Sequence, residues 1–137
     1  MGLLNSAGSA IGLDAMMGRV AAATGTRYLA LLTVSPTAAS TLASVTEYGA
    51  TGYARQIITP GASTGTGPRT QTHTNALTFG PLSGATGAVI ITSWLICDAL
   101  SGTAGIVMAQ GDFTSSRTPA AGDSLTVSVG GITWSIN

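Results

Sequence analysis

The feature that most constrains the fold is a hydrophobic period of two, which begins at Arg27 and is interrupted by glycine, proline and small polar residues. The alternating runs are short, and several are rich in β-branched and aromatic residues, as in "AVIITSWLICD". We therefore predict a mainly β protein, a β-sandwich of jelly-roll type. The predicted strands are 27–34, 53–59, 75–80, 88–98, 106–113 and a pair within 124–136.

The composition of individual runs adds detail to this prediction. "RYLALLTV" at 27–34 is apolar on nearly both faces, which is typical of a central strand. The segments 35–52 and 114–123 are predicted loops. The segment "PGASTGTGPRTQT" at 60–72 is predicted to lack regular structure because of its prolines and glycines.

The final segment, "SLTVSVGGITWSI", predicts a β-hairpin with Gly130-Gly131 as its turn. This register sets Val129 against Ile132, and its other pairs are Val127 with Trp134 and Leu125 with Ile136. One long strand with a glycine bulge is the alternative. Trp134 packs on the core in both interpretations.

The N-terminal region is predicted to hold an extended arm, Met1 to Gly8, followed by one short helix that ends near Gly25 and has Ser9 as a candidate cap. Residues 1–25 are thus assigned to an arm and helix, and residues 26–137 to the β-sandwich domain. The arm and helix carry the apolar candidates for a structural or interface role, Leu3, Leu4, Leu13, Met16, Met17 and Val20.

Charge is unusually scarce, with 7% charged residues, no lysine and a formal net charge of zero. Soluble domains carry about 25% charged residues. A surface so poor in charge favours self-association, so we predict a protein that assembles, as a homo-oligomer and most simply a trimer. Without a basic face it is not expected to bind nucleic acid. Its longest apolar stretch, residues 88–97, is too short to span a membrane.

Motifs for chemistry are missing. The only histidine, His73, has no G-x-S-x-G nucleophile motif with it, and is predicted to be a structural or exposed loop residue. Asp98 and Asp123 lie where aspartate caps its own turn. A single cysteine, Cys97, cannot build a zinc site and is predicted to behave as a small apolar residue. We predict no enzyme activity, metal, cofactor or small-molecule substrate.

Arg55 is the most informative cation, because it lies between Tyr53 and Ile57 in a predicted strand. Its stem can lie along the aromatic ring while its guanidinium is exposed or paired. Glu47, the only glutamate, is its plausible partner across a glycine turn. A structural or interface role is favoured over anion recognition. Trp94 and Trp134 complete the structural candidates.

The order of these segments resembles a family of short virion structural proteins of tailed bacteriophages, described as tail fibre, minor structural or head decoration proteins. The resemblance covers 27–137, and "YAR" at 53–55 and "CDALSG" at 97–102 are its most specific parts. Residues 94–97 stand where the family commonly has Phe-Gly-Ile, and Ser101-Gly102 replaces a Gly-Gly pair. The resemblance implies a virion role and transfers no catalytic residue.

Three functions follow as hypotheses. The first is a capsid decoration protein on the virion surface that contacts the major capsid protein or other virion proteins. The second is a tail-associated fibre or a receptor- or carbohydrate-binding component, with Tyr48, Tyr53 and His73 as sugar-stacking candidates. The third is a small hydrolase that uses His73, which the missing motifs disfavour.

Overall fold

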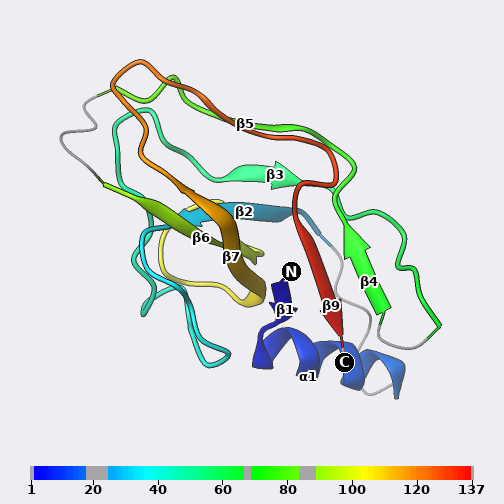
Figure 1. Ribbon diagram of the computed structural model, residues 1–137. Coiled ribbons are helices and arrows are strands. Elements are labelled where there is room, and N and C mark those ends of the chain that lie inside the picture. Colours follow the sequence, from blue (N-terminus) through cyan, green and yellow to red (C-terminus); the bar gives the residue numbers. More distant parts are fainter. Residues whose placement is uncertain (1, 18–24, 67–68, 84–88, 137) are drawn as a thin grey trace.

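The computed structural model describes residues 2–17, 25–66, 69–83 and 89–136. Seven strands form one sheet in the order β3-β2-β6-β7-β1-β9-β4, and two further strands, β5 and β8, form a ribbon (Figure 1). The prediction of a mainly β fold with one short helix is confirmed. The elements are β1 (Gly2–Leu4), α1 (Ser6–Met16), β2 (Arg27–Leu32), β3 (Gln56–Ile58), β4 (Arg69–Thr72), β5 (Leu77–Phe79), β6 (Ile91–Cys97), β7 (Val107–Arg117), β8 (Leu125–Val127) and β9 (Thr133–Ile136).

The larger core lies between the seven-stranded sheet and the β5–β8 ribbon, as in a β-sandwich. Alternate residues of β2 point to opposite faces of the sheet. Leu29 and Leu31 enter this core, whereas Ala30 and Leu32 enter a smaller cluster on the other face. The prediction that β2 is central is confirmed, since it lies between β3 and β6 and is buried on both faces.

The two ends of the seven-stranded sheet are brought together by the chain that follows β3. This chain pairs with the region of β4 through isolated bridges between Pro60 and His73 and between Thr64 and Thr70. The expectation of no regular structure over 60–72 is therefore wrong for 69–72, which form β4. The prolines and glycines lie in the loop between β3 and β4, while Thr64 and Thr70 within this segment pair with each other through their backbone groups.

The side chain of Asn75 hydrogen-bonds to the outer edge of β3. Its side-chain amide donates to the carbonyl oxygen of Ile57 at 2.8 Å and accepts the amide hydrogen of Thr59, with 2.7 Å between Thr59 N and Asn75 Oδ1. These two backbone groups would otherwise face outward as a free strand edge, which invites pairing with other chains. One asparagine side chain thus replaces a short stretch of strand.

The predicted hairpin in the last segment is wrong, and so is the single long strand. β8 pairs with β5, with Leu77 opposite Val127 and Phe79 opposite Leu125, while β9 pairs with β4 and β1. Between them the chain turns from one layer to the other, and Gly130 adopts a φ of +72°. Apolar residues on both sides of the glycines do reach one core, but from two layers instead of two adjacent strands.

The N-terminal segment forms part of the sheet. β1 lies between β7 and β9, with α1 beside it (Figure 1). The helix begins at Ser6, so Ser9 is not its cap. Asn5 caps it instead, with its Oδ1 2.9 Å from the amide nitrogen of Ala7. The residues 18–24 of the predicted helix, Val20 included, lie outside the described residues.

Two further strand boundaries differ from the prediction. β3 begins at Gln56, so Tyr53 and Arg55 precede the strand, and β7 extends to Arg117 into the predicted loop 114–123. Among the described residues, no helix is long and apolar enough to cross a membrane.

Candidate functional site

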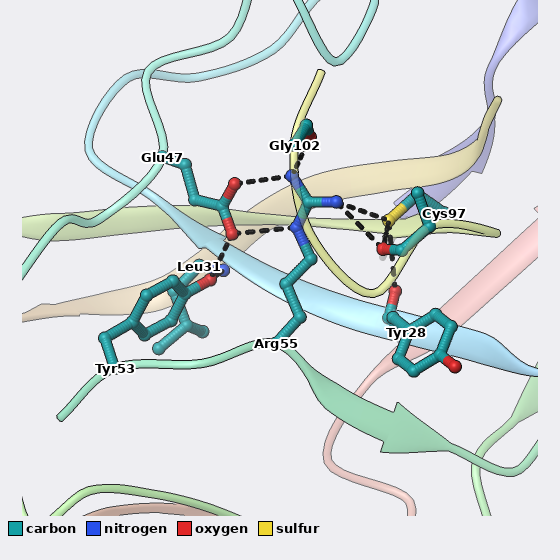
Figure 2. A network of polar contacts seen from close by, with 8 residues as sticks. Tyr28, Leu31, Glu47, Tyr53, Arg55, Cys97 and Gly102 are labelled. Carbon is teal, nitrogen blue, oxygen red and sulfur yellow. Dashed lines mark hydrogen bonds and ion pairs between the residues drawn. The ribbon is translucent and has the colours of Figure 1, made fainter. Parts of the chain in front are cut away.

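Arg55 and Glu47 form a buried ion pair beside the central strands (Figure 2). Arg55 Nη2 lies 2.7 Å from Glu47 Oε2, and Arg55 Nε lies 2.9 Å from Glu47 Oε1. The Arg55 side chain is 4% exposed and that of Glu47 is 26% exposed. The pairing expected from the sequence is present, and its two parallel hydrogen bonds are the strongest geometry available to these side chains.

The other donors of Arg55 are also occupied. Nη1 donates to the carbonyl oxygen of Ala99 at 2.8 Å and approaches Cys97 Sγ at 3.8 Å, and Nη2 donates to the carbonyl oxygen of Gly102 at 2.8 Å. A guanidinium has five N–H groups, and here each has a protein acceptor. No donor remains for an anionic ligand, so the geometry gives Arg55 a structural role.

Tyr53 extends this network towards β2. Its hydroxyl donates to Glu47 Oε1 at 2.8 Å and accepts the amide hydrogen of Leu31, at 2.9 Å between heavy atoms. Its ring stacks on Phe79 with centroids 5.9 Å apart. Burial, together with the nearby charge of Glu47, raises the pKa of Tyr53 well above its ordinary value, so the hydroxyl stays protonated and continues to donate.

Cys97 is the buried end of the network. Its Sγ lies 3.3 Å from the carbonyl oxygen of Ala99 and 3.7 Å from that of Tyr28. Burial raises the pKa of the thiol, which keeps it protonated. The thiol thus fills space and makes weak hydrogen bonds, in line with a small apolar residue.

The network holds the loop between β6 and β7 against the sheet. Arg55 binds this loop at Ala99 and Gly102, and Asp98 closes it by accepting the amide hydrogen of Ile106, with 2.7 Å between heavy atoms. Asp123 likewise closes the turn before β8 through the amide of Ala120, so both predicted aspartate caps are present.

This loop presents apolar side chains to solvent. Leu100 is 58% exposed, and Ile106 is also exposed. Ile57 on β3 is exposed as well. We call the two exposed residues of the loop that Arg55 binds, Leu100 and Ile106, the outer patch.

The remaining sequence candidates are distributed over the molecule. Trp94 and Trp134 are buried in the larger core. Leu13 and Met17 lie four residues apart at the far end of α1 and are exposed, 60% and 74% respectively. Leu3 and Leu4 belong to β1 and Met16 ends α1. The structure thus brings Glu47, Tyr53 and Arg55 together. The candidate residues of the helix do not take part in this network.

The proposed sugar-stacking residues are not available for that task. Tyr48 and His73 are buried, and the Tyr53 ring packs between Tyr48 and Phe79. His73 Nδ1 lies 2.7 Å from the carbonyl oxygen of Asn75, which gives that nitrogen the proton, and its Nε2 has no hydrogen-bond partner among the described residues. In the part of the chain that the structure describes, no three His, Cys, Asp or Glu side chains gather as metal ligands.

Two residues that organise the structure were missed at the sequence level. Asn5 is buried, and its amide nitrogen donates to the carbonyl oxygens of Ala38 and Ser40, at 2.9 and 3.0 Å. Gly8 packs so closely that an added Cβ would overlap the carbonyl oxygen of Met108. The Asn-Ser pair before the helix is a sequence signal for an N-cap and could have been recognised. The close packing of Gly8 against Met108 could not, because it involves a residue far away in the sequence.

The comparison with known families agrees with these features of a structural protein. The family model of podophage GP4 fiber I protein gp80 matches residues 5–135. The chain belongs to this family. It is therefore a phage virion structural protein, as the resemblance implied. No curated protein matches the chain.

Proposed function

We propose that the protein is a non-enzymatic component of the podophage fibre that works through contacts with other protein chains. The match to a fibre protein family over residues 5–135 carries this proposal. The saturated guanidinium of Arg55 supports it, because the most conspicuous cation serves the fold and leaves no donor for a substrate.

The surface favours assembly. The chain has 7336 Å² of accessible surface and ten charged residues, of which Arg55 and Glu47 neutralise each other. The other eight correspond to about one charge per 900 Å². Large apolar side chains are exposed at several places, including the outer patch and the end of α1. Such a surface is suited to being covered by neighbouring chains.

A homo-oligomer, with a trimer favoured, is part of the same proposal. Three copies of the 13.5 kDa chain would give about 40 kDa, which light scattering coupled to size exclusion can measure. A single-copy mass at high concentration would contradict the oligomer. Replacement of Leu100 by serine is expected to shift the mass towards single copies if the outer patch lies between them.

The location on the particle separates the two virion roles. Immunogold labelling of intact particles with antibodies to this protein is expected to mark the fibres. Labelling of the capsid shell would instead support the capsid decoration role, which relies on the same surface. Particles from a phage that lacks the gene provide the control for antibody specificity. Absence of label from every part of the particle would contradict both roles.

A further inference from the structure

The end of β7 leaves the regular ladder with β6. Ile91 of β6 lies opposite Arg117, and Ser93, two residues later, lies opposite Asp112. Residues 113–116 of β7 therefore stand opposite a single residue of β6, which makes a large bulge. A bulge bends the strand that contains it and changes the direction of its side chains. The bulge residues are thus free to line the space between β7 and β8.

A cavity of about 250 Å³ lies between this bulge and β8. Its floor belongs to the larger core, since Leu31, Phe79 and Ile91 line it and each is at most 2% exposed. Exposed residues of the bulge and of β8 form its rim, and they include Ser115 and Arg117. We call it the β7–β8 cavity. It joins the apolar core to the surface.

Arg117 places a positive charge at the rim of the cavity. Its side chain is exposed and makes no ion pair or hydrogen bond with a described residue. An apolar cavity of about 150 Å³ holds benzene, so the β7–β8 cavity is large enough for a leucine side chain and part of a second side chain. An apolar cavity with a cation at its edge suits an apolar anchor that lies beside a carboxylate.

The loop between β6 and β7 carries these complementary groups. Leu100 is 58% exposed and Ile106 is 37% exposed, and Asp98 lies two residues before Leu100. Asp98 Oδ1 accepts the amide hydrogen of Ile106, whereas Oδ2 accepts no hydrogen bond from a described residue. Among the acidic side chains that the structure describes, only that of Asp98 has a large exposed apolar residue within four positions in the sequence.

This loop has a fixed shape within the single chain. Arg55 donates to the carbonyl oxygens of Ala99 and Gly102, at 2.8 Å each, and Asp98 closes the loop. A surface that is ordered in advance loses little conformational entropy when it binds. The ion pair of Arg55 with Glu47 thus prepares the outer patch for a contact with another chain.

The cavity and the loop lie at opposite ends of β6 and β7 (Figure 1). Cys97 pairs with Val107 beside the loop, whereas Ile91 pairs with Arg117 beside the cavity. The seven residues of β6 separate these two pairs by about 20 Å of extended chain. One copy therefore cannot place its own loop in its own cavity, and the two surfaces can meet only between copies.

We propose that the outer patch of one copy docks in the β7–β8 cavity of the next copy, with Leu100 inside the cavity and Asp98 paired with Arg117. Such a contact joins two different surfaces, so each copy is both donor and acceptor. Contacts of this kind close into a ring when the rotation between copies allows it, and three copies give the favoured trimer. The inference rests on the proposed homo-oligomer and does not depend on whether the protein lies on the fibre or the capsid.

Disulfide crosslinking of the purified protein tests this geometry. Ser101→Cys places a thiol beside Leu100, and Ser115→Cys places one in the cavity, while the native Cys97 is buried. We expect the double variant to form crosslinked species up to the full oligomer under mild oxidation, and each single variant to give at least about tenfold less. The control pair, Ser101→Cys with Ser63→Cys, uses an exposed residue that does not line the cavity and should also give about tenfold less. Efficient crosslinking by Ser101→Cys alone, or equal yields for the two pairs, would overturn the proposal.

The ion pair between copies has a test of its own, the dissociation constant of the oligomer from light scattering over a dilution series. Arg117→Met and Asp98→Asn should each weaken association about tenfold, and the double variant should lose little more than either one. Asp98→Asn keeps the oxygen that accepts the amide hydrogen of Ile106, so the loop stays closed. Arg69→Met, at another exposed arginine, is the control and should leave association within about twofold.

The outcomes separate this docking from the wider assembly role. Arg117→Met is expected to leave the unfolding of dilute single copies unchanged, so a weaker oligomer reports the contact between copies. Additive losses in the double variant would show that Asp98 and Arg117 are not paired. An oligomer that both substitutions leave intact would refute this docking but not the proposed homo-oligomer, whereas a single-copy mass for the unaltered protein would contradict both.

Discussion

Replacement of Arg55 by methionine tests whether the buried ion pair organises this protein. Methionine retains most of the apolar stem and removes the guanidinium. The substitution leaves the Glu47 carboxylate with Tyr53 alone and removes the donors to the carbonyl oxygens of Ala99 and Gly102. We expect a large loss of stability, because a buried charge then lacks its partner.

The size of the loss follows from the burial of the two side chains. Removal of one partner from a fully buried pair costs about 3–5 kcal/mol. Glu47 is 26% exposed, so water can partly solvate its carboxylate, which reduces the cost. Against this, the loop carbonyl oxygens lose charge-assisted hydrogen bonds. Together these effects place the expected loss near 3 kcal/mol. For a chain of this length the midpoint of thermal unfolding should fall by about 10 °C.

Urea and thermal unfolding followed by tryptophan fluorescence can measure this, since Trp94 and Trp134 are buried in the core. Arg117→Met is the matched control, because the Arg117 side chain is exposed and makes no ion pair or hydrogen bond with a described residue, and it should change stability by less than about 0.5 kcal/mol. The double variant Arg55→Met with Glu47→Gln should lose less than the sum of the single losses. Equal losses for Arg55→Met and Arg117→Met would refute the reasoning.

Three further predictions concern other contacts. The pKa values of Cys97 and Tyr53 are raised in the folded state, which therefore holds these two protons more tightly than the unfolded state does. The free energy of unfolding should therefore be unaffected by either group at neutral pH. It should fall as pH rises past about 8.5 because of the thiol and past about 10 because of the phenol. Cys97→Ala should flatten the first part of this fall in pH-dependent urea titrations, and an unchanged slope would contradict it. Asn5→Ala should cost about 2 kcal/mol through the lost cap and the unpaired carbonyls, whereas Ser9→Ala, at the cap expected from sequence, should be nearly neutral by the same measurement. Asn75→Ala frees two backbone groups at the edge of β3 and should increase self-association in light scattering, and no increase would show that this edge needs no cover.

Much of the secondary structure could be predicted because strands leave a local trace. The apolar composition of 27–34 indicated a central strand, and β2 is buried on both faces. The small number of charged residues also made the ion pair of the site predictable. With one glutamate in the sequence, eight residues before Arg55, the pair was a natural expectation, and the structure contains it.

The partners of the strands were harder to predict. Residues on both sides of Gly130-Gly131 alternate correctly for a hairpin, yet they belong to two layers. Alternation tells which side chains are buried and says nothing about which strand lies alongside. The β4 strand was missed for a related reason, because its polar sequence is stabilised by pairing with β9.

The sequence by itself determined that this chain forms short strands around an apolar core and has little charge to keep copies apart. Only the tertiary structure decided that β1 enters the sheet between β7 and β9, that β8 and β9 belong to different layers, and that all donors of Arg55 are used. The physical reason is that periodicity is a property of neighbouring residues. Strand pairing and donor saturation depend on segments far apart in the chain, and are fixed only when the whole sheet has formed.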